Sequence, residues 1–144
     1  NNNEVIQKIM NRGRLRAMKG LTSNSNVSQL IDWLKDGKTV LYGPDQDYKN
    51  KRSVVSEFFK QKCLTTTVPY TLKNITKCKL IYLDFYKTSN GYEFIFEDVS
   101  DIADSKQNFA DEINSIIERS VTKAPEHYFW HHRRFKSQAP EIYD

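Results

Sequence analysis

The sequence predicts an α/β fold in which a mixed sheet, containing one antiparallel hairpin, is flanked by helices. Two observations predict it. Apolar residues recur at helical spacing in several segments, and short β-rich runs lie between those segments. Helical and extended segments therefore alternate over most of the chain, which is typical of α/β or α+β domains. With 144 residues, 38% of them hydrophobic, the chain fits one domain with a modest core.

Two helices are predicted near the start of the chain. The first stops before Gly13 and carries the basic segment 11–16. Its apolar stripe consists of Val5, Ile6, Ile9 and Met10. The second has Ser25 or Asn26 as its cap and Gly37 as its terminator. Its apolar stripe, at i, i+3, i+4 and i+7, consists of Val27, Leu30, Ile31 and Leu34.

The middle of the chain reads as extended segments around one helix. A β-rich run at 39–43 is expected to form a strand that leads into the polar loop 45–52. Thr67 is placed to cap a helix that has Pro69 in its first turn and Leu72 and Ile75 on one face.

An antiparallel hairpin and a last helix follow. The runs 79–87 and 91–97 flank a short polar stretch that ends in Asn90-Gly91, which is a strong hairpin signal. Apolar residues at 109–117 then indicate a helix that Asp104 caps, with Gln107 placed for a capping box and Pro125 beyond its end.

The net charge of +4 conceals a basic segment near the start of the chain. No acidic residue lies between Val5 and Ile31, so this stretch should attract anions. Its cations are Lys8, Arg12, Arg14, Arg16 and Lys19. No apolar run reaches the length of a membrane span and no signal peptide opens the chain, so the chain as given is expected to be soluble.

The chemistry-bearing residue types give no metal or redox motif. Cys63 and Cys78 have neither a zinc-site spacing nor a disulfide framework. The three histidines, His127, His131 and His132, lack both a paired acid and a metal-binding spacing. We therefore expect no metal and no cofactor.

Two features leave alternatives open. Asp45 and Asp47 are either a carboxylate pair beside a site or residues of a turn, and residue type alone favours the turn. Arg133 and Arg134 follow an aromatic run, so the tail is either a phosphate-binding anchor or a solvated basic segment. Interleaved cations and aromatics also suit nucleic acid, although the chain contains no known nucleic-acid module.

Five motifs follow one another along the chain: NRGRLR (11–16), YGPDQDY (42–48), FF (58–59), TTT (65–67) and the ending PEHYFWHHRRFK (125–136). In this order and spacing they resemble the lauroyl/myristoyl lipid A acyltransferase family. The ending is the most specific of them. Lys49, Glu57 and Lys60 stand where that family commonly has glycine, proline and glycine, which concerns loop geometry rather than membership.

The resemblance implies the C-terminal portion of a larger acyltransferase domain, like part of the glycerolphosphate-acyltransferase α/β fold. It places an N-terminal membrane anchor and a catalytic H-x4-D/E segment outside this chain, so these 144 residues alone are predicted to be inactive. Such enzymes move a fatty acyl chain from acyl carrier protein to a hydroxyl of an acylated, phosphorylated glucosamine disaccharide. They work at the cytoplasmic face of the bacterial inner membrane and need no metal or redox cofactor.

The resemblance also implies roles for residues. Asp45 and Asp47 are supporting candidates beside the catalytic dyad. The substrate-binding candidates are Arg12, Arg14, Arg16 and Gln46. Structural or headgroup contacts are expected from Glu126, Trp130, His132, Arg133 and Arg134. Acyl carrier protein is expected on the stretch 49–62, and nucleic acid is not expected. The competing hypothesis is a non-catalytic basic module that binds anionic lipid or nucleic acid.

Adjacent side chains on an extended tail point apart, so one of Arg133 and Arg134 should face inward. An inward guanidinium is expected to pair with Glu126, Asp45 or Asp47, because an unpaired buried charge is costly. The tail would then brace the loop that contains the two aspartates.

Overall fold

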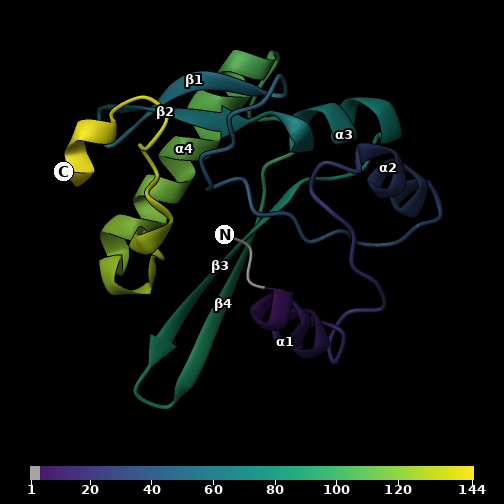
Figure 1. Cartoon of the computed structure of the whole chain (residues 1–144). Coiled ribbons are helices and arrows are strands. Elements are labelled where there is room, and N and C mark those ends of the chain that lie inside the picture. The colour runs from purple at the N-terminus through teal and green to yellow at the C-terminus, as the bar shows by residue number, and fades with distance from the viewer. Residues whose placement is uncertain (1–3) are drawn as a thin grey trace. The chain divides into compact units, whose positions relative to one another are not determined.

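The computed structural model describes residues 4–144 (Figure 1). Its described part contains four α-helices, four strands and three short 3₁₀ helices near the C-terminus. The chain divides into two compact units, the first ending at Val40 and the second running from Leu41 to Asp144. Among the described residues, no helix is long and apolar enough to cross a membrane.

The first unit contains helices α1 (Glu4–Arg14) and α2 (Val27–Lys35). The prediction that the first helix stops before Gly13 is wrong, because α1 continues through Gly13 to Arg14. Glycine costs only about 1 kcal/mol in a helix, and the arginines of the last turn interact favourably with the helix dipole. The second helix is confirmed: Asn26 caps it by accepting a 3.3 Å bond from the Gln29 N–H.

The strand predicted at 39–43 does not form. These residues have no strand partner among the described residues, and the boundary between the two units falls within them. A β-rich run needs a neighbouring strand for its backbone groups, and five residues cannot supply one. The segment instead leads as irregular chain into the loop that contains Asp45 and Asp47.

An antiparallel hairpin that the sequence analysis missed opens the second unit. Strands β1 (Ser53–Phe58) and β2 (Gln61–Thr66) pair from Ser53 opposite Thr66 to Phe58 opposite Gln61. Phe59 and Lys60 form the two-residue turn with φ of 50° and 61°. Such turns usually carry Asn-Gly, because both residues need positive φ. Because Phe59 and Lys60 lack this signal, the sequence did not predict the hairpin.

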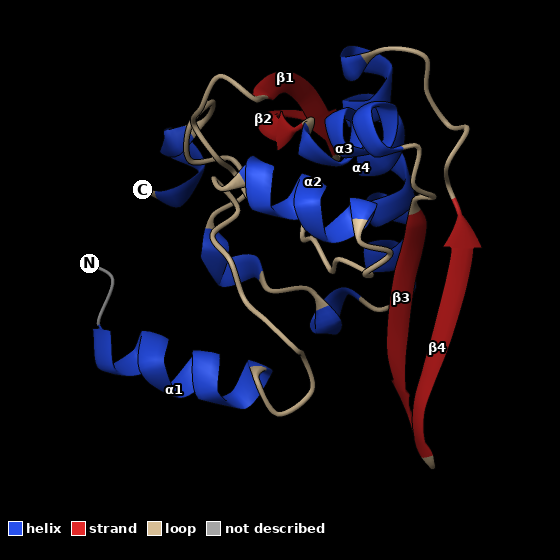
Figure 2. Ribbon diagram, turned by 90° about the vertical axis from the view of Figure 1, so that its right-hand side faces the viewer, coloured by secondary structure: helices blue, strands red, loops and turns tan. Residues whose placement is uncertain are grey.

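The second hairpin is confirmed. After helix α3 (Val68–Thr76), strand β3 (Ile81–Thr88) pairs antiparallel with β4 (Gly91–Asp98), forming the long ribbon of Figure 2. The expected single mixed sheet is not found. The described strands form two separate two-stranded antiparallel sheets, β1–β2 and β3–β4, because each hairpin pairs only with itself.

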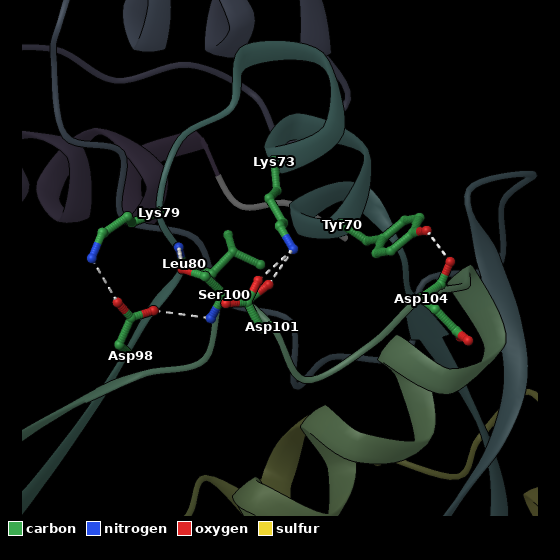
Figure 3. Close-up of polar contacts among 8 residues, drawn as sticks. All are labelled: Tyr70, Lys73, Lys79, Leu80, Asp98, Ser100, Asp101 and Asp104. Atoms are coloured by element: carbon green, nitrogen blue, oxygen red, sulfur yellow. Dashed lines mark hydrogen bonds and ion pairs between the residues drawn. The ribbon is translucent and has the colours of Figure 1, made fainter.

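Polar contacts join both α3 and the base of the second hairpin to the segment that follows the hairpin (Figure 3). Lys79 at the start of this hairpin forms a 3.0 Å ion pair with Asp98 at its end. Lys73 of α3 reaches the Ser100 carbonyl and lies 3.5 Å from Asp101. The start and end of the ribbon are thereby held together beside α3.

Helix α4 (Lys106–Lys123) supplies most of the core of the second unit. Its cap is Ser105, which accepts from the Asn108 N–H, and not Asp104 as predicted. Gln107 makes no capping box, because its side chain donates to the Val55 carbonyl at 2.9 Å.

The buried apolar cluster consists of Phe58, Cys63, Val99, Phe109, Ile113, Ile116, Ile117 and Val121. This cluster fixes β1 and β2 on α4, next to the C-terminal tail.

Candidate functional site

The C-terminal tail holds the loop 45–47 at two points. The side chain of Asp47 is buried, and its Oδ2 accepts a 2.8 Å hydrogen bond from the Ser137 N–H. The hydroxyl of Tyr128 donates to the backbone carbonyl of Asp45 at 3.3 Å. Gln46 lies exposed between them, with its Oε1 accepting from Tyr48. The fold therefore brings together two of the motifs that the sequence analysis singled out.

The carboxylate of Asp45 differs from that of Asp47 in being available. Asp45 is half-buried, and within residues 4–144 its side chain forms no hydrogen bond or ion pair. Burial, and then the negative charge of Asp45, raise the pKa of Tyr128 above its usual value. The loop thus presents one anchored and one unengaged carboxylate.

The tail folds as short 3₁₀ turns over the end of β1. Pro125–His127 and Trp130–His132 are two such turns, and the Trp130 Nε1–H donates to the Pro125 carbonyl at 2.9 Å. Tyr128 packs its ring 5.7 Å from that of Phe58. Its hydroxyl lies 3.3 Å from Nε2 of His132, whose other ring nitrogen contacts the Phe129 carbonyl. These contacts give His132 and Trp130 a structural role within the tail.

Of the two adjacent arginines, Arg134 faces inward and Arg133 outward. Arg134 is 1% exposed, whereas Arg133 is exposed, has φ of 55° and lies over the Tyr143 ring at 5.5 Å. The guanidinium of Arg134 donates to the Leu64 carbonyl at 2.7 Å and to Thr65 Oγ1 at 2.8 Å. The prediction that the pair points apart is confirmed.

The predicted carboxylate partner of the inward arginine is wrong. Within the described residues no acid pairs with Arg134. Glu126 is exposed and lies 3.9 Å from His127. Neutral oxygens take the place of the acid, since a guanidinium has five donors and can be hydrogen-bonded by several carbonyl and hydroxyl groups at once. The Phe58 ring, 5.6 Å away, adds a cation–π contact.

Asn114 links this arginine to the two strands and was missed by sequence reasoning. Its Oδ1 accepts from Arg134 at 3.0 Å, and its Nδ2 donates to Ser56 Oγ and Thr65 Oγ1, each at 2.9 Å. All four side chains are buried. We call Ser56, Thr65, Asn114 and Arg134 the buried polar cluster. The available signal was an amide inside the apolar stripe of α4, beside Ile113, Ile116 and Ile117.

The arginine segment belongs to the first unit. Arg12, Arg14 and Arg16 are all exposed, in the last turn of α1 and the turn that follows it. Arg12 and Arg16 line a shallow, open hollow together with Lys8, Asn11 and Leu15, and Arg14 lies outside it. Two guanidiniums and an ammonium beside one hollow form an anion-attracting surface.

The cysteines and the other titratable side chains bear on whether the chain has a metal-binding arrangement. Among residues 4–144 no group of three or more His, Cys, Asp or Glu side chains converges to hold a metal ion. Cys63 is buried, Cys78 is half-buried, and both are free thiols. The cations of the stretch 49–62 are exposed; they are Lys49, Lys51, Arg52, Lys60 and Lys62.

Comparison of the sequence with known proteins assigns the chain to a family. Residues 1–137 match the sequence profile described as bacterial lipid A biosynthesis acyltransferase. The chain belongs to that family. It is 31% identical over 141 residues to the lipid A biosynthesis palmitoleoyltransferase of Escherichia coli K12, covering 95% of this chain. It is 32% identical over 143 residues to the lauroyltransferase of the same organism, covering 96% of this chain.

A lipid A biosynthesis acyltransferase of Haemophilus influenzae is 30% identical over 155 residues, a match that covers the whole chain. The matches span 46%, 47% and 50% of these three relatives. The chain therefore spans about half the length of the acyltransferases that it resembles.

Proposed function

We propose that this chain is part of an enzyme that transfers a fatty acyl group from an acyl carrier protein thioester to a hydroxyl of an acylated, phosphorylated glucosamine disaccharide. The match of residues 1–137 to the family carries this proposal. The family supports this reading over the competing non-catalytic binding module. In the proposal, the full-length acyltransferase has a glycerolphosphate-acyltransferase-like α/β domain. This chain forms one part of that domain, and the rest of the acyltransferase forms the other.

In this reaction a base must remove the proton of the attacking hydroxyl. The histidines of this chain lie in the tail, and His132 is engaged with Tyr128 and the Phe129 carbonyl. We assign the base to the H-x4-D/E segment of the family, so the isolated chain is inactive. Asp45 is assigned a supporting role, because its carboxylate is unengaged while its backbone is held by Tyr128. It would orient a basic group or the acceptor beside that base.

The exposed cations suit the two charged substrates. Arg12 and Arg16 share one hollow and would contact the phosphates of the acceptor, since the planar guanidinium donates two parallel hydrogen bonds to phosphate. Arg14 projects from the same segment outside the hollow and would assist them. The exposed cations of 49–62 would receive the acidic acyl carrier protein. Gln46 and Arg133, both exposed, remain proposed contacts to the acceptor and its headgroup.

The proposal places the enzyme at the cytoplasmic face of the bacterial inner membrane, where a phosphorylated glycolipid acceptor would meet a water-soluble donor. The cations of the arginine segment would then face an anionic lipid surface, whose negative potential attracts basic groups. Acyl transfer of this type needs no metal or redox group.

The test is acyl transfer by the full-length protein carrying Asp45→Asn. We expect a loss of activity of about 100-fold or more, because the amide keeps the shape but removes the charge that orients a catalytic group. Glu112→Gln, which neutralises an exposed carboxylate of α4, is the matched control and should retain near-normal turnover. Normal turnover in Asp45→Asn would return this residue to a turn role. Turnover by residues 1–144 alone would overturn the assignment of the base to another segment.

A further inference from the structure

We propose that one face of the β3–β4 hairpin is a docking surface for the part of the acyltransferase chain that these 144 residues do not match. The inference rests on family membership and not on the proposed reaction. We call this surface the apolar hairpin face. Its residues are Ile81, Leu83, Phe85, Tyr92, Phe94 and Phe96.

Strand register places these side chains on one face. Leu83 lies opposite Phe96 and Phe85 lies opposite Phe94, and the two phenylalanine rings stack with centroids 6.3 Å apart. Residues at positions i and i+2 of a strand share a face, which adds Ile81 and Tyr92 to the same surface. All six are exposed, Phe94 to 58% and Phe96 to 69%. The result is a contiguous band of apolar groups along the ribbon.

The opposite face of the same hairpin contacts the C-terminal half of α4, mainly through polar groups. The Tyr82 hydroxyl donates to Ser120 Oγ at 2.9 Å, and Arg119 pairs with Glu97. Lys123 lies 3.8 Å from the centroid of the Tyr86 ring. The hairpin therefore has its polar face toward the helix and its apolar face outward.

This arrangement is the reverse of that of a solvated ribbon. An antiparallel sheet with one wet face normally turns its polar residues to water and its apolar residues to the core. Contiguous exposed apolar surface on soluble proteins marks an interaction site, and a two-stranded ribbon gains stability from packing on both faces. A second layer of protein on the apolar hairpin face would cover the outward apolar side chains and would give the ribbon a further packing surface.

The unmatched part of the family chain is the occupant that the observations favour. The relatives are about twice as long as the matched segment, so about half of their length is outside this structure. A lipid surface fits less well. The tip of the hairpin, 87–91, is polar, and strand register places Lys87 and Asp98 at the two ends of the apolar hairpin face. Apolar side chains along the sides of a ribbon, with a polar tip, suit lateral packing of protein.

The experiment compares thiol accessibility in two contexts. The first is the chain of 144 residues alone. The second is the same chain placed in the Escherichia coli palmitoleoyltransferase instead of the segment that it matches. Both carry Cys78→Ser, and Cys63 is buried and does not compete. Phe94→Cys reports on the apolar hairpin face, and Asn90→Cys, in the exposed turn of the hairpin, is the matched control. Maleimide labelling rates are measured for each protein.

We expect Phe94→Cys to label about 30-fold more slowly in the chimera with the palmitoleoyltransferase than in the isolated chain, the factor that corresponds to burying one large side chain. Asn90→Cys should label at nearly the same rate in both. Equal labelling of Phe94→Cys in the two contexts would overturn the proposal. So would protection in the isolated chain that grows with its concentration, which indicates a second copy, or protection that appears only with anionic vesicles. This assay does not measure acyl transfer. A failure of the docking proposal would therefore leave the proposed function unaffected.

Discussion

Ser137 donates its backbone N–H to the buried carboxylate of Asp47 at 2.8 Å, across 90 residues of sequence. One charge-assisted hydrogen bond thereby joins the motif 42–48 to the residue that follows the motif 125–136. The neighbouring contact, from the Tyr128 hydroxyl to the Asp45 carbonyl, lies on the same loop. The tail thus controls where the unengaged carboxylate of Asp45 lies, although Arg134 plays no direct part in that control.

We predict that Asp47→Ala lowers the free energy of unfolding by about 2 kcal/mol, because it removes a hydrogen bond to a charged acceptor and leaves the Ser137 N–H without its partner. Asp47→Asn keeps an acceptor oxygen and should cost about half as much. Urea denaturation measures both. Gln46→Ala, on the exposed neighbour, is the control and should have little effect. If Asp47→Ala matches that control, the bond does not brace the loop.

A second prediction concerns the turn between β1 and β2. Lys60 has φ of 61°, in the left-handed region that costs an L-residue about 1–2 kcal/mol. Lys60→Gly should therefore raise the free energy of unfolding by about 1 kcal/mol, after allowing for the greater freedom of glycine in the unfolded chain. Lys60→Ala keeps the strain and is the matched control. Equal stability of the glycine and alanine variants would show that the turn is not strained.

The same turn shows why part of the fold was not predictable from sequence. The β3–β4 hairpin was found because Asn90-Gly91 is a recognised turn signal, and α2 because a single apolar stripe lies between a cap and Gly37. Phe59 and Lys60 form an equally tight turn without any such residue, so tertiary contacts must stabilise it. Among them is the 2.6 Å bond from the Phe59 N–H to Glu118, 59 residues later in the chain.

The candidate site was likewise predictable from the sequence only in part. The prediction that one of Arg133 and Arg134 faces inward is confirmed, although the tail forms 3₁₀ turns instead of the extended segment from which the prediction was argued. The partners of Arg134 depended on which elements the fold brings beside it. Asn114 and Thr65 supply neutral oxygens from α4 and β2, and no local pattern in the sequence connects them with the tail. The rule that a buried guanidinium takes an acid predicted a carboxylate that the fold does not provide.

A third prediction concerns pH. Hydrogen bonding from Ser100, and then from Lys79, lowers the pKa of Asp98 from 3.8 to about 2 (Figure 3). A carboxyl whose pKa is lowered by folding contributes stability above pH 3.8, and that stability is lost as the pH falls from 3.8 through about 2. Carbon-13 titration of the carboxyl group measures the midpoint. In Lys79→Ala the midpoint should rise but stay below 3.8, because the Ser100 bonds remain. A midpoint at 3.8 in the unmodified protein would contradict the prediction.

The last prediction separates the two adjacent arginines of the tail. Arg134→Ala should lower the free energy of unfolding by about 3 kcal/mol, because it removes several buried hydrogen bonds and leaves a cavity beside Phe58. Arg134→Lys should recover only a minor part of this loss. An ammonium on a flexible stem cannot reproduce the planar fork that bridges the Leu64 carbonyl, Thr65 and Asn114.

Arg133→Ala should change stability little, because its guanidinium is exposed and contacts only the Tyr143 ring among the described residues. In the full-length protein it should instead weaken capture of the phosphorylated acceptor. Thermal and urea unfolding of the single variants measure the first effect, and acceptor binding measures the second. Two equal and negligible changes in stability would mean that the tail is a solvated basic segment. The buried polar cluster would then not hold it in place.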